Sequence, residues 1–191
     1  MKTIKYFLFA AISLLTITGC SNKDSEFYND IYVSVPDLVT VETVAQSVTI
    51  KANVPRFLND ADHDNNLDIY KSTSGAVRLN FTYFLERKID AVNWGLYEIP
   101  QSQLMITHGE ALGGQFITAA SLYNDVNKIY EYEVAINGLI PGDYRLGFGY
   151  NSENTTDVEF RSENIDHNLF LNLNSRLIGL DFEGYYHFTV L

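Results

Sequence analysis

Apolar and polar residues alternate along much of this chain. In Val77–Glu86 the odd-numbered residues are apolar or aromatic, and most even-numbered residues are polar. A period of two is typical of a β-strand that buries one of its faces. Tyr185–Leu191 repeats the pattern, with His187 and Thr189 on the polar face. Alternation alone therefore predicts a strand in each of these segments.

Similar runs recur along the chain, separated by residues that favour turns. Their number and short length predict an all-β sandwich or barrel. No window has a long apolar stripe at helical spacing, although Ala119–Asn127 is compatible with a helical turn or two and Asn174–Leu180 is ambiguous. The additional predicted strands are Ile31–Val35, Ser47–Val54, Trp94–Ile99, Gln103–Thr107, Gln115–Ala119, Ile129–Ile136, Tyr144–Tyr150, Asp157–Arg161 and Leu169–Leu173.

Two of these runs are joined by the segment Leu139–Tyr144, which contains a Pro-Gly pair. Proline presets the first dihedral angle of a turn, and glycine accepts a positive one. The Leu-x-Pro-Gly-x-Tyr order resembles the corner of immunoglobulin-like and fibronectin-type-III-like modules, whose tyrosine hydroxyl bonds to nearby backbone. The resemblance implies an antiparallel immunoglobulin-like β-sandwich, with Trp94 as a candidate for its buried core tryptophan. The usual pair of sandwich cysteines is absent.

The N-terminal residues have the organisation of a secretory signal. Lys2 and Lys5 precede an apolar stretch that ends near Leu15. This stretch is shorter than the roughly 20 apolar residues that a membrane-spanning helix needs. We therefore expect a processing segment that is not part of the fold.

The segment Ile17–Cys20 follows, and it contains the only cysteine of the chain. Its order resembles the lipobox of bacterial lipoproteins. The resemblance implies cleavage after Gly19 and acyl chains on Cys20, which anchor a protein stably when there are two or more. The alternative is a plain secretory signal with an incidental free thiol. Ser21 in the next position fits sorting to the outer membrane by the same resemblance.

Three parts of the chain are predicted on this basis. Residues 1–19 are the cleaved lipoprotein signal peptide, and residues 20–29 are the lipidated cysteine and a polar, acidic tether. Residues 30–191 are one β-sandwich domain, a length that suffices for a single buried core. A division into two domains near Pro100 is the alternative.

The chain is acidic, with a formal charge of −11 from 13 basic and 24 acidic residues. Removal of Lys2 and Lys5 with the signal would leave 11 basic residues and a charge of −13. Such a surface repels phosphate backbones, so nucleic acid is not an expected partner. The acidity favours cations or neutral partners such as glycans.

Alternating acidic residues in the segment 59–68 suggest a metal loop. Calcium takes six to eight oxygen ligands, and alternate side chains of a tight loop can direct several oxygens inward. The pattern resembles the calcium loops of EF-hand proteins, but Lys71 stands where an EF-hand requires glutamate. We therefore weigh a non-helical calcium loop against a solvated acidic hairpin. Calcium is the only cofactor suggested, and its candidate ligands are Asp60, Asp62, Asp64, Asn66 and Asp68.

No catalytic constellation is recognisable in the sequence. The four histidines are scattered without the spacing of a zinc site, and the chain lacks a Gly-x-Ser-x-Gly elbow. The polar stretches 151–157 and 161–168, with aromatic residues nearby, are compatible with a sugar-binding surface or with ordinary loops.

These observations favour a cell-envelope lipoprotein of the outer membrane, facing either the periplasm or the cell surface. We expect a non-catalytic binding or scaffolding module whose partners are the membrane, through Cys20, and a glycan or an envelope protein. The alternative function is an extracellular hydrolase that acts on glycans or other polymers.

Overall fold

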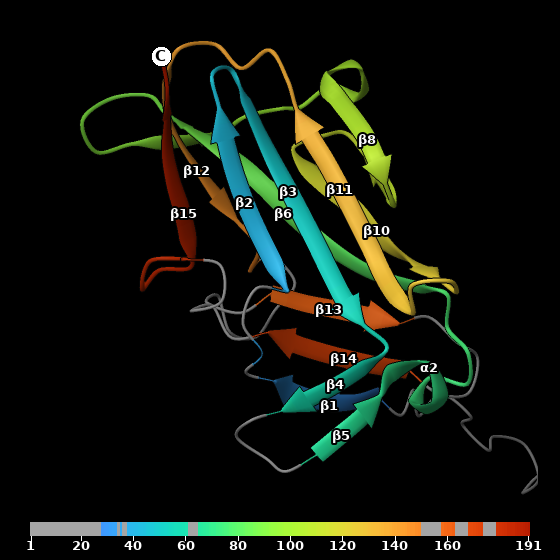
Figure 1. Cartoon of the computed structure of the whole chain (residues 1–191). Coiled ribbons are helices and arrows are strands. Elements are labelled where there is room, and N and C mark those ends of the chain that lie inside the picture. The colour runs from blue at the N-terminus through green and yellow to red at the C-terminus, as the bar shows by residue number, and fades with distance from the viewer. Residues whose placement is uncertain are drawn as a thin grey trace, which may run out of the picture.

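The computed structural model describes residues 28–33, 35, 38–60, 65–149, 158–162, 168–173 and 179–191. Within these ranges the chain is all-β and mostly antiparallel, which confirms the predicted fold class (Figure 1). Helix is limited there to the single turn α2 (Ile69–Ser72) and the 3-10 turn η1 (Gln101–Gln103). None of the described helices has the length and apolar character needed to cross a bilayer.

Among the described residues, most strands belong to one continuous hydrogen-bonded sheet that folds over into two packed layers (Figure 1). The first layer contains, in order, β2 (Val39–Val44), β3 (Ser47–Pro55), β11 (Ile129–Ile136) and β8 (Leu104–His108). The second layer contains, in order, β15 (Tyr185–Val190), β12 (Gly142–Gly147), β6 (Arg78–Lys88), β10 (Phe116–Asn124) and β9 (Glu110–Leu112). The short strand β7 (Trp94–Leu96) pairs with the C-terminal end of β6.

A further group of strands extends the second layer below the sandwich in Figure 1. It joins β6 through β13 (Val158–Ser162), which pairs with β14 (Asn168–Leu173). β14 pairs in parallel with β1 (Tyr28–Val33), which begins inside the segment 20–29 that was predicted to be a tether. A separate hairpin, β4 (Phe57–Asp60) and β5 (Asn65–Asp68), precedes α2.

Strand β6 provides the centre of the core. Leu79, Phe81, Tyr83 and Leu85 are each at most 4 % exposed, at the odd positions that the alternation predicted. The hydroxyl of Tyr83 lies 2.7 Å from that of Tyr132 on β11, so a buried hydrogen bond links the two layers. Burial raises the pKa of both hydroxyls, and both remain protonated donors and acceptors at neutral pH.

The corner predicted from the sequence is present. The Tyr144 hydroxyl donates a hydrogen bond of 2.7 Å to the carbonyl oxygen of Ile140. Leu139 is fully buried on the other side of the turn. The Leu-x-Pro-Gly-x-Tyr segment therefore has the tyrosine-corner geometry that the resemblance implied.

The edge of the sandwich is closed by a crossing at Gly109. β8 pairs with β11 of the first layer, and β9 pairs with β10 of the second, so the chain changes layer between them. Gly109 has a φ of 81°, and a Cβ there would lie 2.5 Å from the carbonyl oxygen of Ala120 and 2.8 Å from the Tyr132 ring. Only glycine fits this crossing without displacing its neighbours.

Two local expectations were wrong. Ala119–Asn127 is not helical, because residues 119–124 belong to β10, where pairing with β6 overrides the local preference, and a turn follows. Trp94 is not a core tryptophan, since it lies half-buried on β7 at the surface of the second layer. The alternation also failed to identify β2, β4, β5 and β9.

The Tyr83–Tyr132 hydrogen bond predicts how substitutions of these two tyrosines change the free energy of unfolding. Tyr83→Phe leaves the Tyr132 hydroxyl buried without its partner, so the free energy of unfolding should fall by about 1–3 kcal/mol. Tyr132→Phe should have a similar cost, and the double variant should lose less than the sum of the two. Urea unfolding measures all three, with Tyr186→Phe as a half-buried control. Additive losses would show that the two hydroxyls do not depend on each other.

Candidate ligand-binding face

The side of β6 that points away from the core carries a second, polar set of residues. We call this side of the second layer the outer face. Residues paired across antiparallel strands lie on the same face, so the pairing registers identify the neighbours of each outer residue. The outer residues of β6 are the even-numbered Arg78, Asn80, Thr82, Phe84, Glu86 and Lys88, all partly or fully exposed.

Two rows of side chains cross the outer face near the C-terminal end of β6. One row runs from Glu86 through Arg145 on β12 to His187 on β15. In the other row, Trp94 on β7 is paired with Lys88. We define the Trp94 cluster as Trp94, Lys88, Glu86, Arg145, Tyr185 and His187.

The Arg145 guanidinium lies at the centre of the Trp94 cluster. Its Cζ is 3.9 Å from the ring centroid of Tyr185 and 4.9 Å from that of Trp94. Its Nε donates to Glu86 Oε2 at 2.5 Å, and the two side chains are only 16 % and 15 % exposed. Cation–π attraction and a charge-assisted hydrogen bond thus hold both aromatic rings in place on a rigid sheet.

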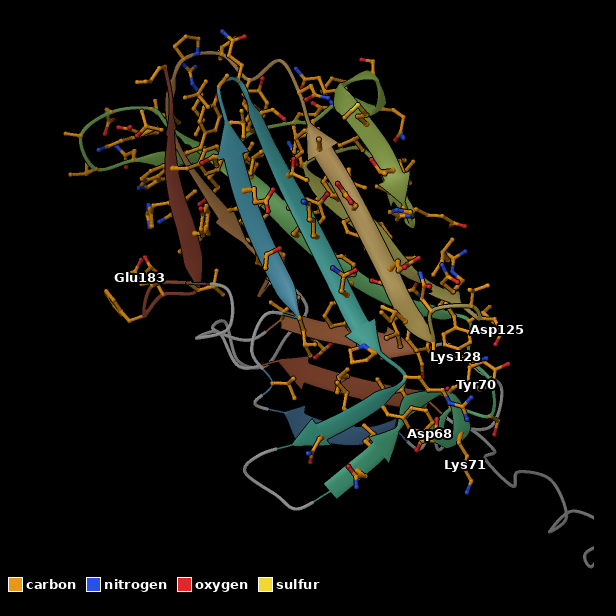
Figure 2. The ribbon with its side chains drawn as sticks, in the orientation of Figure 1. Asp68, Tyr70, Lys71, Asp125, Lys128 and Glu183 are labelled. Atoms are coloured by element: carbon orange, nitrogen blue, oxygen red, sulfur yellow. The ribbon has the colours of Figure 1, made fainter. Side chains whose placement is uncertain are left out.

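His187 is held from two sides. Its ring makes an edge contact with the indole of Trp94, with centroids 5.6 Å apart, and its Nε2 lies 2.9 Å from Oδ2 of Asp181. Oδ1 of Asp181 accepts the backbone N–H groups of Glu183 and Tyr185, each at 2.9 Å. Glu183 marks this turn at the base of β15 in Figure 2. The turn that precedes β15 therefore fixes the orientation of the His187 ring through Asp181.

The ionisation of Asp181 follows from these contacts. Burial by itself raises the pKa of the Asp181 carboxyl, but the Tyr185 N–H, the His187 ring and the Glu183 N–H stabilise the carboxylate more strongly. The net effect is a pKa below the usual value for aspartate. Burial raises the pKa of the Tyr185 hydroxyl, which remains a neutral hydrogen-bonding group at neutral pH.

A depression of about 240 Å³ adjoins the cluster. Three cluster members, Lys88, Trp94 and His187, line it together with Asp143 and its neighbours. Asp143 accepts a hydrogen bond of 2.8 Å from the hydroxyl of Thr189, and it lies 3.9 Å from Nζ of Lys88. Each basic side chain of the cluster therefore has a carboxylate beside it. The depression is close to electrically balanced on a chain whose formal charge is −11.

This arrangement suits an uncharged, hydroxyl-rich ligand. An aromatic ring offers a flat apolar surface to the C–H face of a sugar ring. Carboxylates, a hydroxyl and ammonium or guanidinium groups around the ring can satisfy the sugar hydroxyls. Because the strands fix these groups, little ordering is needed when a ligand binds.

The predicted calcium ligands are described only in part. Asp62 and Asp64 lie outside the described residues, as does the predicted lipidation site Cys20. Asp60 ends β4, and Asn66 is exposed on β5. Within the described ranges, no group of three or more His, Cys, Asp or Glu side chains is arranged to hold a metal ion. Calcium binding by this hairpin stays a prediction.

Asp68, the fifth predicted ligand, is bound to Arg56. Nε and Nη2 of Arg56 donate to its two carboxylate oxygens, both at 2.8 Å, and the Lys71 N–H donates to Oδ1 at 3.0 Å. Arg56 holds the pKa of Asp68 below its usual value. Figure 2 shows Asp68, Tyr70 and Lys71 close together at α2. Since both oxygens are engaged, a calcium ion at Asp68 would have to displace Arg56.

Sequence reasoning did not find the Trp94 cluster. Its members come from residues 86 to 94, 145 and 185 to 187, which only the sheet brings together. The aromatic residues near polar stretches did suggest a sugar-binding surface, but the stretch 151–157 lies outside the described residues and 161–168 is described only at its two ends. The alternation of β6 and β15 was the available signal, because it placed Glu86 and His187 on polar faces.

The lowered pKa of Asp181 predicts a pH-dependent contribution to stability. Because its pKa is lower in the folded state, the contribution is fully present above the unfolded value of about 3.9 and is lost as the pH falls through the folded value. Asp181→Asn should lower the free energy of unfolding by roughly 1 kcal/mol at neutral pH. The difference from the parent should shrink in acid.

Urea unfolding at a series of pH values measures this difference. Glu183→Gln is the matched control, because this exposed residue bonds to Asp181 through its backbone. A loss for Asp181→Asn that is equally large at neutral and acidic pH would contradict the role given to the carboxylate.

Comparisons of the chain with protein-family models, with curated proteins and with solved structures give no match in any of the three. A β-sandwich by itself does not specify an activity, because the same architecture hosts many unrelated functions. Functional inference therefore starts from the residues of the outer face.

Proposed function

We propose that this protein is a non-catalytic binding module of the bacterial cell envelope. Acyl chains on Cys20 anchor it to the outer membrane, and the Trp94 cluster binds a neutral glycan on the outer face. The observation that carries the glycan proposal is the position of Trp94, half-buried on the sheet surface among fixed polar groups.

The charge pairing of the site supports a neutral ligand. Arg145 is paired with Glu86, and Lys88 lies near Asp143. A polyanion would have to displace these carboxylates and would also face the negative charge of the whole chain. Nucleic acid and acidic polysaccharides are disfavoured for the same reason. A neutral sugar meets no such electrostatic barrier.

The position of β1 in the molecule supports an anchor at Cys20 together with a glycan site on the outer face. Seven residues separate Cys20 from the start of β1 at Tyr28. Fully extended, they span at most about 25 Å, so an anchor at Cys20 would hold the β1 end near the membrane. In Figure 1, β1 lies at the lower end of the molecule, whereas β12 and β15 lie toward the other end. The strands that carry Arg145 and His187 would then lie toward the end away from the bilayer.

The anchor is tested by expression of the full chain in a Gram-negative host. Mass spectrometry should find a protein that begins at acylated Cys20, and fractionation should place it with the outer membrane. Cys20→Ala should lose the acyl mass and leave the outer-membrane fraction, while Ser21→Ala should still be acylated. Recovery of the parent as an unmodified, uncleaved cytosolic chain would refute the anchor.

The glycan site is tested by affinity electrophoresis in gels containing starch, β-glucan, xylan or mannan, with alginate as the charged comparison. The mature protein should be retarded by at least one neutral polymer. Trp94→Ala should weaken that affinity roughly tenfold or more, because a central aromatic contact is lost. Phe57→Ala, which removes a 61 % exposed aromatic on β4, should bind like the parent.

The outcomes separate binding from hydrolysis. Equal retardation of the parent and Trp94→Ala would exclude the Trp94 cluster as the site, and retardation by none of the neutral polymers would refute the glycan proposal. Release of reducing sugar from a bound polymer would favour the hydrolase instead. Unfolding measurements on each variant show whether a lost affinity reflects a lost fold.

A further inference from the structure

We infer that the glycan site continues along the outer face of β6 to a second subsite at Asn80, so that the ligand is a polymer chain bound along the strand. This inference rests on the proposed function and specifies its substrate class. Three observations support this inference. There is a second depression near Asn80, aromatic rings connect it to the depression near Trp94, and basic and acidic side chains are paired at both depressions.

The second depression has a volume of about 400 Å³. Its polar lining includes Asn80 and Thr82 on β6, Thr118 on β10 and Arg161 on β13. The register pairs Thr118 with Thr82 and Arg161 with Asn80, so these side chains lie on the same face as the Trp94 cluster. The two depressions therefore open on one continuous surface.

Aromatic rings connect the two ends. Phe84 is the outer residue of β6 between them, and it contacts Phe116 on β10 and Tyr185 on β15, with centroids 5.6 Å and 6.2 Å apart. Its ring lies over Gly147, where a Cβ would be only 2.6 Å from the Phe84 ring. The absence of a side chain at Gly147 lets the ring lie against the sheet. The surface between the depressions is thus aromatic, with its rings packed edge to face.

Charge is balanced at the second depression as at the first. Nη1 of Arg78 lies 2.9 Å from a carboxylate oxygen of Glu110 on β9. Arg161 forms an ion pair with Glu159, whose side chain is 12 % exposed. Paired guanidinium and carboxylate groups can donate to and accept from hydroxyls without favouring a charged ligand. Both depressions therefore suit the same kind of uncharged ligand.

The separation of the ends sets the length of the ligand. The partner of Trp94 is Lys88, and the partner of Arg161 is Asn80, eight residues earlier on the same strand. At a rise of roughly 3.3 Å per residue this corresponds to about 26 Å. A disaccharide cannot reach both ends, whereas a chain of several sugars can.

Isothermal titration of the mature protein with malto-, cello-, xylo- and manno-oligosaccharides, each from dimer to octamer, tests the inference. Affinity for the recognised series should rise at least tenfold from dimer to octamer and level off once both ends are reached. Thr118→Trp places a bulky ring in the second depression, and it should reduce octamer affinity to the dimer level. Thr43→Trp on β2 of the other layer is the bulk-matched control.

Asn80→Ala removes a polar group from the second depression without adding bulk, and it should weaken octamer binding while dimer binding is unchanged. Dimer and octamer affinities that are equal in the parent, or unaffected by Thr118→Trp and Asn80→Ala, would overturn the extended site and leave the Trp94 site intact. Binding of no oligosaccharide and no neutral polymer would overturn the proposed function itself.

Discussion

Strand β6 must present opposite chemistry on its two sides, and this constraint connects the core of the molecule to its outer face. Leu79 to Leu85 at odd positions are buried, while the even positions from Arg78 to Lys88 form the outer face. A shift of one residue in pairing would exchange the two sets, exposing Tyr83 and burying Glu86. The apolar core therefore fixes the register that assembles the proposed site.

Aromatic residues compensate for the lack of an internal disulfide. The sequence has one cysteine, so no internal disulfide joins the layers. They are joined by packing, by the backbone pairing of β10 with β11, and by the Tyr83–Tyr132 hydrogen bond. Phe81 contacts Tyr132 and Phe160, with ring centroids 4.9 Å and 4.8 Å apart. These contacts bring together the first layer, β6 and the strands below the sandwich. A fixed core of this kind gives the outer face the rigidity that pre-organised binding requires.

The order of polar and apolar residues was sufficient to predict strands that have one buried and one exposed face, and to predict the turn at the corner. Alternation identified β6 and β15, and the Pro-Gly order identified the corner at Tyr144. Ala119–Asn127 was misjudged because its local preference is weaker than its pairing with β6. The Trp94 site could not be predicted, since its position depends on contacts with Arg145 and His187, which are far away in sequence.

Trp94 is the only tryptophan of the chain, so its fluorescence reports directly on the proposed site. Titration of the unmodified mature protein with the neutral polysaccharides is therefore the most direct test of the central claim. We predict a saturable change in the intensity and wavelength of tryptophan emission that follows binding measured by calorimetry. Binding that leaves the Trp94 emission unchanged would contradict the account.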